Sequence, residues 1–154
     1  MRPTVRVMLS ALLAAAPVLG SCGDSTPTGL GLDFHTARAR WRAHHPGAYA
    51  YTLERSCFCG PPVTSPVVIE VSGDAVQSRR YAETGVPVDA QLADAFPQID
   101  GLFDIIEGAA RGGAARLVAT YDPSLGYPMQ IEIDYLANAA DDEVTYRVRD
   151  FTTR

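Results

Sequence analysis

Lysine is absent from this chain of 154 residues, so its 13 basic residues are all arginines, and 18 acidic residues outnumber them. The net charge of −5 argues against the basic surface with which proteins bind nucleic acids or anionic lipids. Long apolar runs are also lacking beyond the N-terminal region, and no later segment reaches the ~20 residues of a membrane-spanning helix. The main part of the chain is therefore predicted to be a soluble domain without a nucleic-acid partner.

Short catalytic motifs are absent as well. The chain has neither the H-E-x-x-H pattern of zinc hydrolases nor the G-x-S-x-G turn of serine hydrolases, and it has no phosphate-binding loop. Serines, histidines and aspartates occur, but no spacing places them together. We therefore expect a protein that is not an enzyme and that has no cofactor.

The N-terminal region has the layout of an export signal. Arg2 and Arg6 lead into a short apolar stretch over residues 7–19, without any acid, which is the order of a secretory signal peptide. Small residues then lead directly to Cys22, an arrangement that resembles the bacterial lipobox, in which the cysteine receives a diacylglycerol before cleavage. Residues 1–21 are therefore predicted to be a lipoprotein signal peptide. The alternative is an ordinary signal cut nearby that leaves Cys22 as a free thiol.

The chain beyond Cys22 divides into a tether and a domain. Residues 22–31 are small and polar and are broken by proline and glycine, which is typical of a flexible tether. Residues 32–154 suit a single domain with a hydrophobic core. Without Arg2 and Arg6, 11 of the 13 basic residues face 18 acids, a net charge of −7. We expect this acidic domain outside the cytoplasm in the bacterial cell envelope, anchored by acyl chains on Cys22.

The spacing of apolar residues predicts two main helices and six strands. A helical period marks residues 32–45 and 97–111, and strict alternation marks the strands. The strands are expected at residues 48–59, 67–71, 75–81, 117–121, 129–133 and 144–151. Short turns such as Ser72-Gly73-Asp74 join neighbouring strands, so the pairing is antiparallel. We predict an α+β fold in αβββ-αβββ order, with an antiparallel sheet of about six strands and both helices packed on one face.

Several short motifs follow one another along this predicted domain. They are Tyr49-x-Tyr51, Arg55-x-Cys57-x-Cys59, Leu102-Phe103 with Ile106, Tyr121-Asp122 with Gly126-Tyr127-Pro128, Ile131-x-Ile133-Asp134 and Asp142-Glu143. The ordered set resembles a family of uncharacterised bacterial lipoprotein domains, a domain of unknown function, over about residues 34–152. The resemblance implies an envelope location and a small α+β fold, and it implies no activity.

Cys57 and Cys59 form an even pair once Cys22 is assigned to the lipid. In an oxidising compartment this pair predicts a disulfide. Two residues along a flat strand span ~6.6 Å, at the outer limit of the Cα separation of a disulfide, and a bend at Gly60-Pro61-Pro62 would relieve the strain. The alternatives are reduced or inert thiols, or a redox or metal role.

Tyr49, Tyr51 and Arg55 lie on the same strand face as the two cysteines. We identify these three residues as the candidate face for a ligand or partner, because Arg55 at a groove could bind an anionic ligand. If the face is buried instead, the Arg55 guanidinium needs a carboxylate partner.

A metal site is the weaker alternative for the cysteine pair. It would require His44 or His45 to join Cys57 and Cys59 as ligands. A single C-x-C pair is a weak signal, and adjacent histidines at a helix end are typical of solvated positions that favour the helix dipole. The prediction is therefore that no metal is bound.

Two functional hypotheses follow. The first is a non-catalytic envelope module that binds an envelope protein or a small ligand, which the anchor, the tether and the missing catalytic motifs favour. The second is a redox or metal-handling lipoprotein that uses Cys57 and Cys59, which the close cysteine pair in an exported protein favours.

We expect the mature protein to begin at Cys22 and to carry several acyl chains there, because a single chain gives only marginal membrane binding. Intact-mass spectrometry of the protein purified from the membrane fraction measures this. An unmodified N-terminus beyond residue 22 would show that the lipoprotein hypothesis is wrong.

Overall fold

A computed structural model of the protein describes residues 30–139 and 141–154, so the predicted signal peptide and Cys22 lie outside the described residues. The helices are α1 (Leu32–His44), the 3-10 helix η1 (Ala90–Ala95) and α2 (Ile99–Arg111). The strands are β1 (Ala48–Cys57), β2 (Val67–Ser72), β3 (Ala75–Tyr81), β4 (Arg116–Tyr121), β5 (Pro128–Asp134) and β6 (Val144–Thr153).

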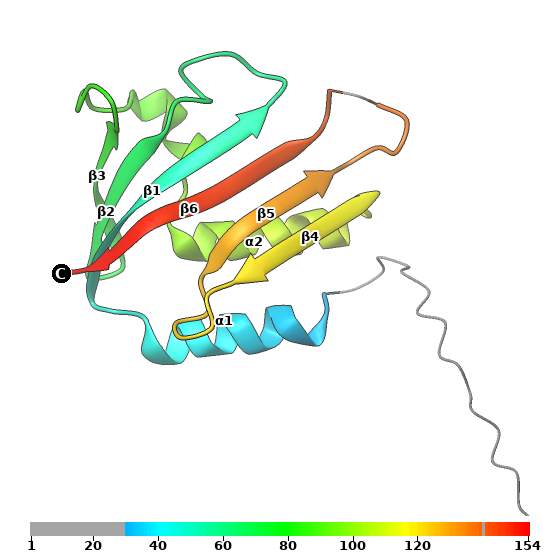
Figure 1. Cartoon of the computed structure of the whole chain (residues 1–154), viewed down its shortest axis with the longest axis horizontal. Helices are drawn as coiled ribbons and strands as arrows, with labels where there is room; N and C mark the ends of the chain where they lie inside the picture. The colour runs from blue at the N-terminus through cyan, green and yellow to red at the C-terminus, as the bar shows by residue number, and fades with distance from the viewer. Residues whose placement is uncertain (1–29, 140) are drawn as a thin grey trace, which may run out of the picture.

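The six strands form one antiparallel sheet in the order β3-β2-β1-β6-β5-β4 (Figure 1). Two three-stranded meanders, β1-β2-β3 and β4-β5-β6, meet where the last strand lies beside the first. The register of this central pair runs from Tyr49 opposite Thr153 to Cys57 opposite Val144. The predicted α+β class and the six-stranded antiparallel sheet are confirmed.

Some boundaries differ from the sequence-based expectations. β1 ends at Cys57, two residues before the expected end. Helix α2 begins at Ile99 with Gln98 at its N-cap, so Pro97 precedes the helix instead of opening it. The Pro97 carbonyl oxygen accepts a 2.6 Å hydrogen bond from the Tyr51 hydroxyl, which holds this segment against the sheet.

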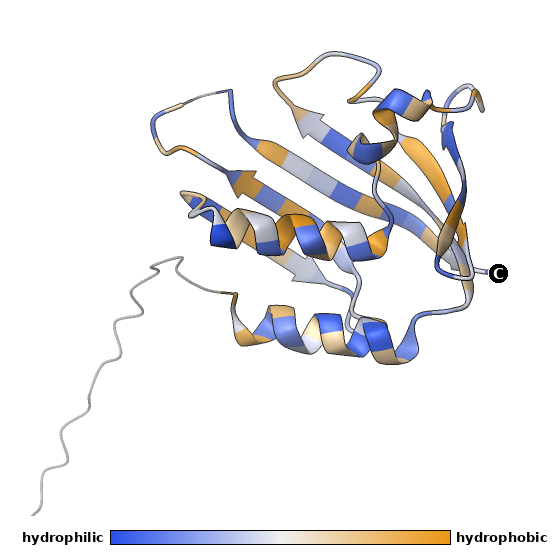
Figure 2. Cartoon of the chain, turned by 180° about the vertical axis from the view of Figure 1, so that it is seen from behind, coloured by the Kyte–Doolittle hydropathy of each residue, from blue (hydrophilic) through white to orange (hydrophobic). Residues whose placement is uncertain are grey.

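The hydrophobic core lies between the sheet and the helices, and Figure 2 views the molecule from the side of α1 and α2. Alternation along β2 buries Val67, Ile69 and Val71, because successive strand side chains point to opposite faces. The helical period of α2 buries Ile99, Leu102, Phe103 and Ile106. Both patterns direct apolar side chains into the same layer.

Aromatic side chains join α1 to the sheet. Trp41 of α1 is 1% exposed and packs edge-on against Tyr49 of β1, with ring centroids 5.3 Å apart. Tyr127 and Phe151 stack on each other at 4.4 Å and both approach the Trp41 ring. Such offset and edge-on contacts add to the gain from burial, so this cluster ties α1 to β1, to the β4–β5 connection and to β6.

A second set of contacts joins the two helices. Phe34 of α1 packs edge-on against Phe103 of α2 with ring centroids 5.9 Å apart. Beside them the Arg38 guanidinium bridges Asp104 at 2.7 Å and Glu107 at 2.8 Å. The side chain of Arg38, which is 18% exposed, therefore links α1 to α2 through two ion pairs.

The turn between β4 and β5 touches α1 at Gly126. This residue has φ of +87°, a conformation that glycine adopts at no steric cost. A Cβ at this position would collide with the main-chain carbonyl oxygen of Ala37. Only glycine therefore lets the turn approach the helix so closely.

Gly126→Ala should lower the free energy of unfolding by about 2 kcal/mol, because it combines a strained φ with a clash against backbone. The matched control is Gly60→Ala, whose added Cβ meets nothing within 4 Å and should be close to neutral. Urea unfolding of both variants measures the difference. Equal stabilities would contradict this account of α1 docking.

Candidate functional site

The strand face that carries Tyr49 and Tyr51 is covered, which corrects its assignment as a ligand or partner face. The exposed fractions of the two side chains are 3% and 1%. Burial raises the pKa of both phenols, so both stay neutral at physiological pH. The two tyrosines belong to the core beneath α1 and α2. The alternation of side chains along a strand indicates that they share a face, but it does not indicate whether that face is covered.

Arg55 lies further along the same strand face, near the end of β1, and is half-buried. Its guanidinium carbon lies 5.7 Å from the centre of the Tyr146 ring, a cation–π distance. The buried Nε atom has no hydrogen-bond partner, and no ion pair to Arg55 occurs in residues 30–139 and 141–154. The carboxylate partner expected for a buried guanidinium is therefore not observed there, and Arg55 contacts an aromatic ring instead.

Cys57 and Cys59 are joined as a disulfide in the structure, with their Cα atoms 5.2 Å apart. The chain bends here because β1 ends at Cys57, so the separation is shorter than along a flat strand. Phe58 between them is 84% exposed. A depression of about 200 Å³ adjoins the pair and is lined by Ser56, Cys57, Phe58, Asp141, Glu143 and Thr145. The pair is thus at the surface, at one end of the sheet.

His44 and His45 lie at the other end of β1, which corrects the metal alternative. His44 is the last residue of α1 and His45 is its C-cap. The ten residues of β1 place nine residue steps, about 30 Å, between the two ends of the strand. The His44 Nδ1 atom lies 3.0 Å from the Arg40 carbonyl oxygen, and His45 Nδ1 lies 3.9 Å from Asp74. Within the described residues, no three His, Cys, Asp or Glu side chains are grouped to hold a metal.

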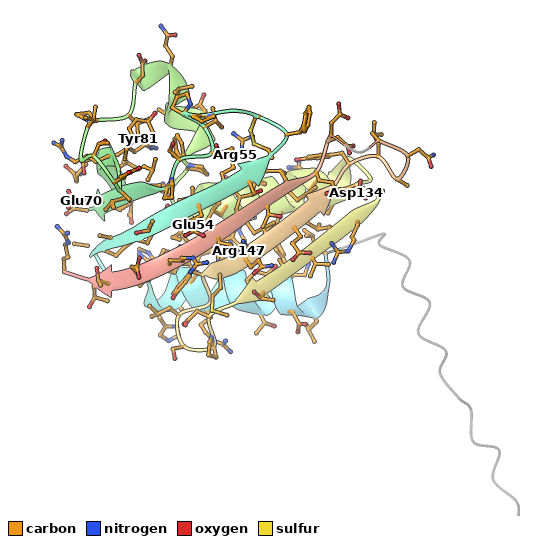
Figure 3. All side chains as sticks on the ribbon, turned by 45° about the horizontal axis from the view of Figure 1, so that its top comes forward. Glu54, Arg55, Glu70, Tyr81, Asp134 and Arg147 are labelled. Carbon is orange, nitrogen blue, oxygen red and sulfur yellow. A yellow bond between two sulfur atoms is a disulfide. The ribbon has the colours of Figure 1, made fainter. Side chains whose placement is uncertain are left out.

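The opposite face of the sheet, here called the open face, is polar. In Figure 1 the sheet lies in front of the helices, and no described helix covers this side. Three ion pairs of 2.8 Å cross it, each between an arginine and a glutamate: Arg116–Glu132, Arg149–Glu54 and Arg154–Glu70. Glu54 and Arg147 are opposite each other on β1 and β6 (Figure 3).

Hydrogen bonds connect these charged groups into a row across β4, β5 and β6. The Arg147 Nε group donates to Gln130 at 3.3 Å, and the Gln130 amide donates to Glu132 at 2.5 Å. The hydrogen bond from Arg116, followed by that from Gln130, lowers the pKa of Glu132 below its ordinary value of 4.5. Glu132 is therefore anionic at neutral pH, and the order of charges is fixed.

Glu70 extends the pattern on β2. It accepts a 2.8 Å hydrogen bond from the Ser78 hydroxyl, which with the nearby Arg154 lowers its pKa. Exposed ion pairs contribute little to stability, whereas a fixed order of charges selects partners. The sequence signal for the open face is the set of polar residues at alternate strand positions, between the buried ones; the same pattern is typical of an ordinary solvated face.

The fold and the open face define a small α+β domain built on an open six-stranded antiparallel sheet. The chain belongs to DUF6174, a family of unknown function, whose model matches residues 33–153. Comparison with curated proteins and with solved structures found no match. In the part of the chain that the structure describes, no helix is both long and apolar enough to cross a membrane.

We expect mass mapping under non-reducing conditions to find the Cys57–Cys59 bond in the purified protein. The double variant Cys57→Ser, Cys59→Ser should lose less than about 2 kcal/mol of unfolding free energy, because so short a loop removes little entropy from the unfolded chain. Two free thiols in the wild-type protein would contradict the disulfide, and a larger loss would show that it is a major structural bond.

Proposed function

We propose that the protein is a lipid-anchored module of the bacterial cell envelope that binds a partner through the open face without catalysis. The observation that carries the binding role is the hydrogen-bonded row of polar and charged side chains from Arg116 through Glu132 and Gln130 to Arg147. Side chains that already occupy their bound positions lose little entropy on association. The partner is an envelope protein or a small ligand with complementary charges.

The anchoring part of the proposal rests on the export signal and on Cys22. The tether, residues 22–31, leads into the first turn of α1, and α1 packs on the helix side of the sheet through Trp41. An anchor on that side would leave the open face accessible to partners in the envelope.

A photo-activated cross-linking residue in place of Thr52, on the open face of β1, tests the binding role. We expect an adduct in living cells from position 52, and none from a matched position at the exposed Gln91 of η1. Arg147→Glu should reduce the adduct about tenfold or more, since like charges across an interface cost several kcal/mol. Equal labelling from positions 52 and 91 would contradict binding through the open face, and thermal unfolding checks that each variant is folded.

A second candidate function is thiol–disulfide exchange at Cys57 and Cys59. The observation that favours it is the position of the pair, at the surface beside a depression, with Phe58 84% exposed. Exposed disulfides of this kind are more readily reduced than structural ones. A reduction potential well above about −300 mV would favour this role, whereas a lower value would leave a structural bond.

A further inference from the structure

One edge of the sheet has a row of main-chain groups without partners. β4 is the last strand in the sheet, and the Asp122 N–H donates towards β5, to the Tyr127 carbonyl oxygen at 2.9 Å. Because main-chain groups alternate sides along a strand, the N–H and C=O groups of Leu117, Ala119 and Tyr121 point away from the sheet. Among the described residues, no strand or isolated bridge pairs with β4 on that side.

The other edge of the sheet is partly covered by the chain itself, at the end of β3. The N–H of Tyr81 in β3 donates to the Val86 carbonyl oxygen, and the N–H of Val88 donates to the Arg79 carbonyl oxygen, both at 3.0 Å. In the described part of the chain no segment covers β4 in this way, and beyond Arg116 at its start residues 117–121 include neither charge nor proline. Natural proteins usually protect bare edges with a covering segment, charged side chains or proline, so this largely unprotected edge indicates a pairing site.

A groove lies between this edge and α1. Its volume is about 410 Å³, and its lining includes Asp33, Thr36, Ala37 and Arg40 of α1 with Ala119 and Tyr121 of β4. A strand added to β4 would direct alternate side chains into this groove and the others towards the open face. Edge pairing with a neighbouring groove is the general mode by which domains capture extended peptides.

The charge of the groove favours a basic side chain. Asp33 is exposed and has no ion pair among the described residues. Burial of Tyr121 raises the pKa of its phenol to about 12, and the negative charge of the nearby Asp33 adds to this effect. Asp122 also lines the groove, and Arg40 is the one cation among the lining residues; it donates to the Pro123 carbonyl oxygen at 3.0 Å. The two carboxylates outnumber the guanidinium, so the groove has a net negative charge.

We propose that the β4 edge binds an extended segment of a partner protein as a seventh, antiparallel strand, with a lysine or arginine of that segment beside Asp33. Antiparallel addition continues the pattern of the sheet and gives the stronger pairing. This inference goes beyond the open-face proposal, because it assigns a different surface and specifies the chemistry of the bound segment. It can hold whether or not the open face binds a partner.

The probes are two capped seven-residue peptides that alternate threonine and valine. In the first peptide one valine is replaced by arginine, and in the second the same valine is replaced by glutamate. Fluorescence anisotropy with the purified protein should give about tenfold weaker binding of the glutamate peptide, as expected for loss of one charged hydrogen bond. The difference between the peptides should vanish in Asp33→Asn. Equal binding of both peptides, or no binding at about 1 mM, would overturn the proposal.

Ala119→Pro tests the edge itself. Proline removes an outward N–H and leaves the hydrogen bonds to β5 in place, and edge strands accept proline at such positions. We expect binding of the arginine peptide to weaken about tenfold, while the control variant Gln91→Ala, at an exposed position of η1 outside the groove, binds like the wild type. Asp33→Asn keeps the test valid if Ala119→Pro does not fold.

Amide hydrogen exchange identifies the surface that is used. The arginine peptide should slow exchange at Leu117, Ala119 and Tyr121, whose N–H groups become donors to the added strand. Protection confined to the other strands would overturn the proposal. Self-association of the wild-type protein that Ala119→Pro abolishes would also overturn it, since the edge would then belong to a second copy of this chain.

Discussion

The pairing of β1 with β6 connects two strands that lie almost at the two ends of the domain sequence. Each meander alone would be a three-stranded sheet with two bare edges, and joining them gives both central strands neighbours on either side. Closing such a long loop costs entropy, which the backbone bonds along two ten-residue strands and the burial beneath them offset. The pairing covers β1 and β6, and it leaves β3 and β4 as the two edges of the sheet.

The helices then distinguish the two faces of this sheet. Trp41 is surrounded by Tyr49, Tyr127 and Phe151, and Gly126 permits the close approach of the β4–β5 turn to α1. One face therefore becomes the core, and the residues of the other face remain free to form ion pairs. Those pairs contribute little to folding.

The open face and the β4 edge adjoin each other, since Arg116 belongs to both the edge strand and the row of charges. The first offers fixed side-chain charges, and the second offers main-chain donors and acceptors beside an acidic groove. The Cys57–Cys59 pair belongs neither to the open face nor to the β4 edge. It closes too short a loop to stabilise the fold strongly.

The sequence alone determined the class of the fold, because the periods of apolar residues in β2 and α2 follow directly from local geometry. It also predicted a disulfide between Cys57 and Cys59, which are two residues apart in the chain. Only the tertiary structure decided which face of β1 is covered, so that Tyr49 and Tyr51 became core residues, and how far His44 and His45 lie from the cysteines. The alternation of side chains along a strand indicates which residues share a face. Packing between elements that are distant in the sequence decides whether that face contacts a helix or the solvent.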